Sequence, residues 1–568
     1  MLKSRAKQPP NHHIKVRTKK KITPASQTHR TLSGQFYLGW LEIKTNPIIT
    51  LASLGLGLLI LISTLIRLPA IYQAYSSDIF EAGGIYREGV VGEVQVINPI
   101  LAKTSTDRDL THLIFSGLTK FGQTGKLEPD LAKSWEIDPT GLIYTFHLRD
   151  DVKWHDGHAF SARDVDFTLT AIQNPDTRSG LQADWQNVNH KVIDDNTLEL
   201  TLPTRVNNFI NQTTIGIIPS HLLESVEPNK LRFHSFNLAP VGTGAFRYLD
   251  YQDNKLITLE KNPDFYHGIP YLDQIQIQTF VSKGDLLLAY SQNQIDSFSG
   301  ISLELDPNYL YKLRQNSYIG LFLNNSSEKL NSPEKRLSLE QLIDKPALLE
   351  SIDLSNQAVP INYPVFSDQE GYNQSLGKHN YNPDQALARL REFGLEPNQT
   401  NYKLVTTSSL STIAEAVSNQ LLAFGIELDI NIILSQQQLN DTIASRDYDI
   451  LLFGQNTGSD SDVYSFWHSS QADFAGTNLA NYKNTEADRL LESARLDSDA
   501  KSRAEKISDF LEIWQADTAS IILYRPYYLI YSRIELDLPV YKIITPSNRF
   551  DFAYLWKIKT TSQSQVKP

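Results

Sequence analysis

The sequence contains no cysteine, which excludes disulfides, thiolate zinc sites, cysteine nucleophiles and lipid attachment through an N-terminal cysteine. It also contains neither G-x-S-x-G nor H-E-x-x-H, and it shows no internal repeat. We therefore expect that the protein is not an enzyme and uses no cofactor. What is present is a chain of 568 residues, 41% of them hydrophobic, which is long enough for two or three domains with ample cores.

Charge is missing from residues 45–66, which include the run PIITLASLGLGLLILISTLI. About 20 apolar residues are enough for a helix that spans a bilayer. Residues 1–46 hold ten Lys or Arg against one Glu, and the positive-inside rule keeps such a flank in the cytoplasm. The sequence thus predicts a basic cytoplasmic tail at 1–46, a transmembrane anchor at 47–67, and a protein that crosses the cell membrane once. A cleaved signal peptide is the alternative, but the basic leader is long and no small-x-small cleavage site stands out in 68–77.

The charge is distributed unevenly along the chain. The tail carries +9 of a total net charge of −11, so the part beyond it carries −20. An acidic part of this kind does not suit nucleic acid. Beside a membrane span, the basic tail is expected to contact anionic lipid headgroups.

The stretch 127–171 holds the clearest local pattern. Alternating apolar residues predict strands at 134–138 and 143–148, and Gly141 suits the tight turn between them. Ser161, with Asp164 three positions on, then predicts a capping box that starts a helix. These signals indicate a hairpin that leads into a capped helix in a mixed α+β domain.

A second turn in this stretch contains His155 and Asp156, which could be interpreted as an acid–base pair. The turn context favours a structural role, with His155 bonding within the loop. Residues 240–246 place two glycines around a threonine, as a phosphate-binding loop can. No lysine follows them and the next segment is a strand, so a structural turn is expected.

The stretch 127–171 also resembles a known family. The runs P-x-LAxSWE, G-x-x-YTFxLR, VKWHDG and F-S-A-x-DVxFT are similar to the signature of the bacterial solute-binding proteins of peptide-type ABC transporters, the large oligopeptide- and dipeptide-binding family. The resemblance covers residues 84–558. It implies a mixed α/β, periplasmic-binding-protein-like fold of the large three-lobed type, with a hinged ligand cleft.

The resemblance also implies domain boundaries. It places lobe I at 84–105, 229–317 and 526–558, an inserted lobe II at 106–228, and lobe III at 318–525.

Ligand contacts are implied at four places in the chain. A cleft for peptides needs aromatic walls, partners for the ligand backbone and carboxylates for its α-ammonium group. By the resemblance, four features face the ligand. They are the crossing after the first strand, an aromatic residue of lobe II, a tyrosine before an element like G-x-I-D, and the loop after a buried strand of lobe III. The residues at these places are Lys103, Thr104, Ser105, Trp185, Tyr290, Gln455, Asn456, Asp460 and Asp462.

The lobe III loop departs from the family pattern. Peptide binders of the family carry an aspartate there that pairs with the peptide N-terminus, and counting back from Phe466 puts Ser459 at that position. Either Asp460 takes the role or the ammonium contact is missing. Asp462 could instead start the helix expected at 464–468. The spacing Asp460-x-Asp462 lacks the glycine and distal glutamate of a calcium loop, so we expect no metal site.

The resemblance therefore implies a membrane-anchored, monomeric binding protein whose solute-binding part faces the periplasmic space. It would capture peptides and deliver them to the permease subunits of an ABC transporter, with ATPases behind them. A different ligand, such as a nickel complex or a sugar, is an alternative within the same fold. A surface scaffold that has lost transport is a second alternative.

Overall fold

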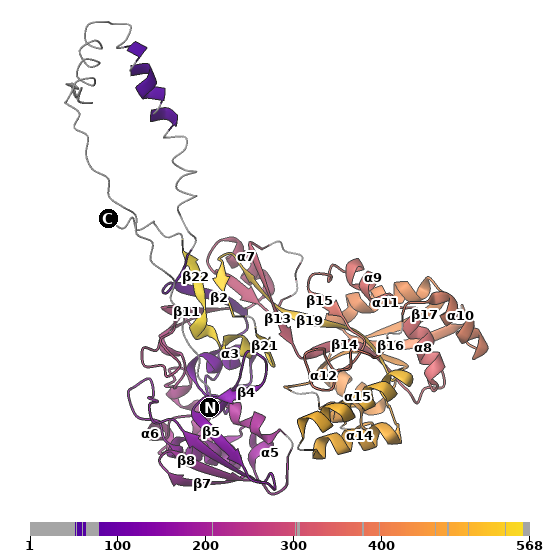
Figure 1. Ribbon diagram of the computed structural model, residues 1–568, viewed down its shortest axis with the longest axis horizontal. Coiled ribbons are helices and arrows are strands. Elements are labelled where there is room, and N and C mark those ends of the chain that lie inside the picture. Colours follow the sequence, from indigo (N-terminus) through magenta and orange to yellow (C-terminus); the bar gives the residue numbers. More distant parts are fainter. Residues whose placement is uncertain are drawn as a thin grey trace, which may run out of the picture. The chain divides into compact units, whose positions relative to one another are not determined.

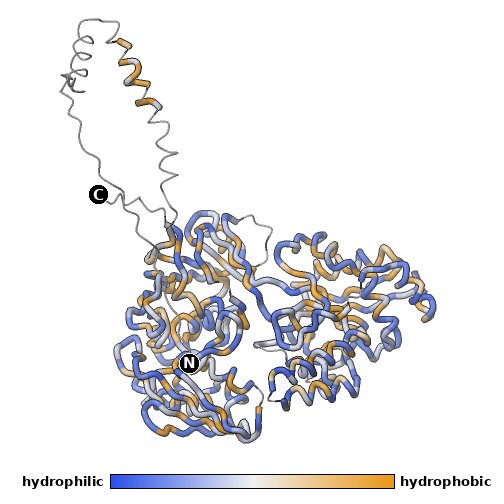
Figure 2. The backbone as a smooth tube through the Cα atoms, in the orientation of Figure 1, coloured by the Kyte–Doolittle hydropathy of each residue, from blue (hydrophilic) through white to orange (hydrophobic). Residues whose placement is uncertain are grey.

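The computed structural model describes residues 51–52, 54–59, 61–63 and 79–560, without 207, 302, 304–306, 378–379, 397, 460–461, 474–475, 498 and 540. The chain divides into two compact units, Met1–Asp78 with Thr561–Pro568 and Ile79–Thr560. The expected tail and most of the expected anchor at 47–67 lie outside the described residues. The described residues of 51–63 are helical and mostly hydrophobic (Figure 2). No helix in the described part of the chain is long and apolar enough to span a bilayer.

A mixed sheet of 13 strands organises the unit Ile79–Thr560 (Figure 1). Its main path runs in the order β17 (Ile426–Ile433), β16 (Thr400–Thr407), β18 (Ile450–Asn456), β14 (Ser317–Leu323), β19 (Ile521–Ser532), β12 (Ser297–Ser299), β2 (Ile85–Val91), β11 (Gln274–Phe280), β10 (Leu256–Lys261) and β9 (Phe246–Gln252). Off this path, β13 (Tyr309–Gln315) and β15 (Ala358–Pro360) pair with β19, and β21 (Lys542–Ile543) pairs with β13. The long strand β19 joins the two parts of the sheet, because its first residues pair with β14 and its last with β12.

A separate antiparallel sheet holds the hairpin that the sequence predicts. Its strand order is β5 (Ala132–Ile137), β6 (Ile143–Leu148), β8 (Thr197–Thr201) and β7 (Asn189–Asp194). Gly141 has a φ of 72°, as the tight turn requires. The predicted capping box of Ser161 and Asp164 starts α4 (Ala162–Gln173), whose Val165 and Leu169 are buried. Both local predictions are confirmed.

The spacing of Leu110, Leu113, Ile114 and Leu118 predicts a helix over 107–118, but the structure has α3 at Ser105–Ile114, so the predicted bounds are wrong at both ends. It starts earlier because Thr104 caps it. It stops at Ile114 because the next residue is extended and the Gly244 amide donates to the Ile114 carbonyl at 2.8 Å. A Cβ on Gly242 would lie 1.9 Å from that carbonyl oxygen, so the close approach requires glycine. The 240–246 segment is therefore a structural turn, as predicted.

Further helices lie between residues 182 and 516. They are α5 (Gln182–Trp185), α6 (Ser220–Leu223), α7 (Lys283–Ser291), α8 (Pro333–Gln341), α9 (Lys345–Ser351), α10 (Pro383–Glu392), α11 (Ser411–Leu422), α12 (Gln436–Ser445), α13 (Tyr464–Trp467), α14 (Thr485–Leu496) and α15 (Ala500–Ala516). The remaining strands form a small sheet of β1 (Ile79–Glu81), β22 (Lys557–Thr560) and β20 (Leu536–Asp537), and a hairpin of β3 (Thr119–Phe121) and β4 (Leu127–Pro129).

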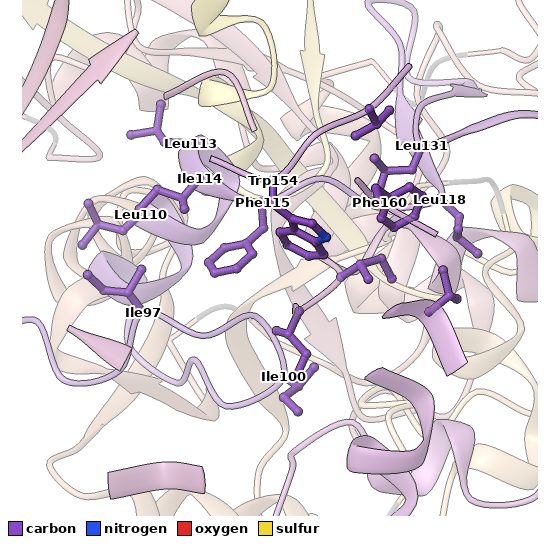
Figure 3. Packing of buried hydrophobic residues seen from close by; sticks show 14 of the residues in the cluster. Ile97, Ile100, Leu110, Leu113, Ile114, Phe115, Leu118, Leu131, Trp154 and Phe160 are labelled. Carbon is purple, nitrogen blue, oxygen red and sulfur yellow. The ribbon is translucent and has the colours of Figure 1, made fainter. Parts of the chain in front are cut away.

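Tryptophans mark the two main hydrophobic cores. Trp154 is buried beside Phe160 in the core that α3, α4 and the four-stranded sheet share, with ring centroids 6.2 Å apart (Figure 3). In the second core, Trp467 and Trp514 pack edge to face with ring centroids 5.2 Å apart, close to β14 and β18. Burying rings of this size contributes strongly to stability. The two cores fix the segments that line the cavities described next.

Candidate ligand-binding site

A cavity of about 320 Å³ lies where four distant segments of the folded unit meet. Its walls come from the β3–β4 hairpin, the 3₁₀ helix Phe209–Thr214, residues 368–370 and the loop after β18, with α14 and α15 behind. The Asn211 Nδ2 donates to the Ser459 Oγ at 2.6 Å, which links two of these walls across 248 residues of sequence. The cavity is therefore a tertiary feature built by chain segments that have no local relation.

Charged side chains dominate the lining of this cavity. Two arginine–carboxylate pairs face it: Arg495 Nε lies 2.7 Å from Asp462 Oδ2, and Arg503 Nη2 lies 2.8 Å from Glu370 Oε2. Lys126 also lines the cavity, and among the described residues it has no carboxylate partner. The cavity can thus present both positive and negative groups to a polar ligand. Lys126 can bind an anionic group of the ligand without breaking an ion pair within the described residues.

Asp368 anchors one wall of the cavity. Its Oδ1 lies 2.7 Å from Arg525 Nη1, and its Oδ2 lies 3.7 Å from Lys542 Nζ. Burial raises the pKa of Asp368, but the Arg525 hydrogen bond and charge outweigh that effect and hold the pKa below its usual value. The same burial lowers the pKa of the Lys542 ammonium. This group is a fixed ionic support for the wall.

Asp462 has two local roles in the structure. Its Oδ1 accepts a hydrogen bond from the Tyr464 amide at 3.0 Å, at the start of α13. Its Oδ2 pairs with Arg495, whose guanidinium lies 4.2 Å from the centroid of the Tyr464 ring. The interpretation of Asp462 as a helix-start residue is therefore supported, and its carboxylate also lines the cavity. Asp460 lies outside the described residues.

Two further cavities hold other residues that the sequence indicates. Lys103 lines a cavity of about 500 Å³ beside α3, and Gln455 and Asn456 line one of about 430 Å³ at the end of β18. Phe121 lines both the first of these and the charged cavity. The Asn456 Nδ2 donates to the Ile544 carbonyl at 3.3 Å, and Ile544 lines the Lys103 cavity. The three cavities therefore lie next to one another, because they share wall residues or have walls that are hydrogen-bonded.

The other indicated residues have packing or capping roles in this structure. The Thr104 Oγ1 accepts from the Asp107 amide at 3.0 Å, and Ser105 is the first residue of α3. Trp185 is 1% exposed and packs on Phe209, which leaves it no surface for a ligand here. None of these three lines the cavities described above.

Tyr290 belongs to a different packing cluster. It lies in α7 and packs edge to face on Phe298 at 5.0 Å, with the Arg533 guanidinium 5.3 Å from its ring centroid. Burial raises the pKa of its hydroxyl. Tyr290 does not line the three cavities, so its predicted ligand contact stays a prediction.

Sequence reasoning missed Lys126, Asp368, Glu370, Arg495 and Arg503 as candidate site residues. None of them belongs to a binding motif, so no local signal marks it as a site residue. Thr104-x-x-Asp107, in contrast, was a readable capping box that explains why Thr104 caps α3.

His155 has the structural role that its turn predicts. The Gly242 amide donates to its Nδ1 at 3.2 Å, and its Nε2 donates to the Gly244 carbonyl at 3.0 Å. This pattern requires a neutral imidazole with its hydrogen on Nε2. Burial lowers the pKa of His155 to about 4, in agreement with that state.

Comparisons with known proteins identify the family and support the fold. The sequence model described as bacterial extracellular solute-binding proteins, family 5 Middle, matches residues 126–476. This chain therefore belongs to the family 5 extracellular solute-binding proteins, and the expected family and mixed α/β, periplasmic-binding-protein-like fold are confirmed.

Individual relatives extend the match over most of the chain. The oligopeptide-binding protein AppA of Bacillus subtilis is 25% identical over 482 residues, which cover 78% of this chain and 87% of AppA. The structure of AppA with a nonapeptide has a TM-score of 0.64 at 23% identity, covering 85% of this chain and 100% of that one. NikZ from Campylobacter jejuni, in complex with Ni(L-His), has a TM-score of 0.64 at 24% identity, covering 84% and 100%.

Proposed function

We propose that this chain is a membrane-anchored extracytoplasmic solute-binding protein that captures peptides and delivers them to the permease of an ABC transporter. The observation that supports the proposal most is the charged cavity that Asn211 and Ser459 bridge, in a chain related over most of its length to an oligopeptide-binding protein. The absence of G-x-S-x-G and H-E-x-x-H favours binding over catalysis.

A peptide offers an ammonium group, a carboxylate and backbone amides, and the cavity has a partner for each. Lys126 would bind the ligand carboxylate, because it forms no ion pair among the described residues that would have to break first. Glu370 and Asp462 would share their charge between their arginine partners and the ligand ammonium. Asn211 and Ser459 would exchange their mutual hydrogen bond for bonds to the ligand backbone.

Closure on the ligand would be a hinge motion between the expected lobe III and the expected unit of lobes I and II. The strand β19 supports this proposal, because it is shared by the β14 and β12 parts of the large sheet. A hinge in a continuous strand keeps both lobes hydrogen-bonded while they rotate. The lobe boundaries stay part of the proposal.

The anchor belongs to the same proposal. The uncharged run within 45–66 follows a basic flank, and leucines of the helical residues, such as Leu51 and Leu59, expose 71% and 65% of their surface. Exposed leucines at this density suit a lipid environment. We propose that residues 47–67 hold the binding unit at the outer face of the cell membrane.

A non-peptide ligand is the second candidate function. Two observations favour it: NikZ in complex with Ni(L-His) matches the fold over its whole length, and Ser459 stands where the resemblance places the aspartate for a peptide ammonium. A small chelate or a sugar would need hydrogen bonds in place of a carboxylate at that point.

Mass spectrometry under denaturing conditions tests the proposal directly. The full chain is purified in mild detergent and its bound small molecules are released and identified. A ladder of short peptides is the expected result. One defined non-peptide compound would support the second candidate. An empty protein that no peptide mixture stabilises against heat would contradict the peptide proposal.

Lys126→Gln then tests the site. We expect at least a tenfold loss of peptide affinity, which is about 1.4 kcal/mol. Lys133→Gln is the matched control, because Lys133 is also exposed and lies outside the cavity. Equal affinities of the two variants would contradict the role of Lys126.

A further inference from the structure

Two histidines and an aspartate gather on the surface at a place that the binding function does not use. The ligating atoms of Asp156, His158 and His221 all lie within 4.8 Å of one another. The His221 Nε2 lies 2.8 Å from one Asp156 oxygen, and the His158 Nδ1 lies 3.2 Å from the other. The two imidazole rings are stacked with centroids 4.2 Å apart. Both rings thus direct a nitrogen toward one carboxylate.

The turn that carries Asp156 and His158 is held rigidly. The Trp154 amide donates to the His158 carbonyl at 2.8 Å, and Gly157 has a φ of 94° that favours glycine. Trp154 itself is buried in the core (Figure 3). The neighbouring His155 ties the turn to Gly242 and Gly244.

His221 reaches the turn from α6, and Asp164 connects the two. The Asp164 Oδ1 accepts from both the amide and the hydroxyl of Ser220, at 3.0 and 2.6 Å. The Asp164 Oδ2 accepts from the Trp154 indole at 3.3 Å. One buried carboxylate thus positions the residue before His221 and the residue at the start of the turn. The three candidate ligands are placed by a common support.

We propose that Asp156, His158 and His221 form a binding site for a divalent transition-metal ion such as Zn²⁺. Imidazole nitrogens and a carboxylate oxygen are preferred zinc ligands, with bonds of about 2.0–2.2 Å. Tetrahedral geometry at these bond lengths separates ligand atoms by about 3.4 Å. The His221 nitrogen lies 2.8 Å from one Asp156 oxygen and the His158 nitrogen lies 3.2 Å from the other, while the three ligand atoms lie within 4.8 Å of one another. Side-chain rotations that bring these atoms to the tetrahedral separation admit the ion. A water completes the coordination.

The site is separate from the proposed solute site. None of its three residues lines the charged cavity or the two neighbouring cavities. The metal would join the 154–158 turn to α6, which lies about 65 residues further along the chain. The sequence could not show this site, because no spacing motif connects His158 with His221.

Zinc titration tests the proposal. The full chain is purified in mild detergent without a histidine tag, treated with a chelator and desalted. It is then titrated with zinc chloride against a chromogenic chelator. We expect His158→Gln and His221→Gln each to weaken this site at least tenfold, which is about 1.4 kcal/mol. We also expect Zn²⁺ to raise the thermal midpoint of the parent chain but not of the variants.

His190→Gln is the matched control. His190 also pairs with one aspartate, at 2.7 Å from Asp166, but it belongs to no three-ligand group among the described residues. Its zinc affinity is expected to equal that of the parent, and His12 and His13 are present in every variant. The His158 side chain is 63% exposed, so His158→Gln leaves the fold intact. Zinc affinity that is unchanged in both His158→Gln and His221→Gln would overturn the proposal, as would a parent chain that binds no zinc.

Discussion

Two arginine–carboxylate groups in this protein use the same chemistry in opposite surroundings. Arg549 is 1% exposed and bonds to Glu88 at 2.9 Å and to Asp109 at 2.6 Å in the core. Arg495 is 41% exposed and bonds to Asp462 at 2.7 Å on the cavity wall. The bond lengths hardly differ, so the difference lies in solvent access.

Solvent access decides what each group can do. Burial lowers the pKa of Arg549, but the charges of Asp109 and Glu88 outweigh that effect and raise it well above its usual value. Removing one partner from such a group leaves a buried charge without compensation. On the cavity wall, water replaces a lost partner at little cost. The buried group is therefore structural, and the exposed pair is free to exchange partners with a ligand.

Arg549→Met should have the largest effect on stability. It leaves Glu88 and Asp109 buried without their cation, and we expect the free energy of unfolding to fall by about 3–5 kcal/mol. Urea titration of the full chain in mild detergent measures this loss. Adding Glu88→Gln and Asp109→Asn to the variant should restore part of it, because the uncompensated charges disappear.

Arg489→Met is the control for that experiment. Arg489 pairs with Glu486 on the exposed face of α14. We expect no measurable change in the urea midpoint. If Arg549→Met were no more destabilising than Arg489→Met, burial would not distinguish the two kinds of ion pair.

The parts that the sequence predicts correctly depend on neighbouring residues. The turn at Gly141 and the Ser161–Asp164 capping box are each fixed within a few positions, where propensity and capping act. The end of α3 was predicted wrongly because the Gly244 amide donates a hydrogen bond to the Ile114 carbonyl, and Gly244 lies 130 positions further along the chain. Tertiary contacts of this kind leave no local pattern.

The candidate site was predictable only in part for the same reason. Asp462 and the loop after β18 follow from the family resemblance, and both line cavities. Lys126, Glu370 and Arg503 come from three distant segments that only the fold brings together. Trp185 shows the opposite case: the sequence indicates a large amphipathic ring, but packing on Phe209 decides that it is buried.

His112 occupies an intermediate position between the two arginines and predicts a pH effect. It is 29% exposed, and its Nδ1 lies 2.6 Å from Asp551. Burial lowers the pKa of His112, but the Asp551 carboxylate outweighs that effect and raises it above the usual value of about 6.5. The folded state thus holds the proton more tightly than the unfolded state. The stability from this pair is fully present below about pH 6.5 and is lost as the pH rises through the folded pKa.

His112→Gln isolates this contribution. We expect the stability difference between parent and variant to be largest at pH 5.5 and to shrink toward pH 9, measured by urea titration at each pH. A difference that stays constant with pH would show that His112 contributes by packing alone.

Asp462→Asn should have only a small effect on stability, and it tests the exposed side of the comparison directly. Asparagine keeps the side-chain oxygen that accepts a hydrogen bond from the Tyr464 amide, and the Arg495 guanidinium can form hydrogen bonds with water instead. We therefore expect the free energy of unfolding to change by less than about 1 kcal/mol. Peptide affinity, measured by calorimetry, should fall because the ligand ammonium loses its carboxylate. A destabilisation as large as that of Arg549→Met would mean that the cavity wall depends on its ion pair in the way the core does, and the pair could then not be exchanged with a ligand.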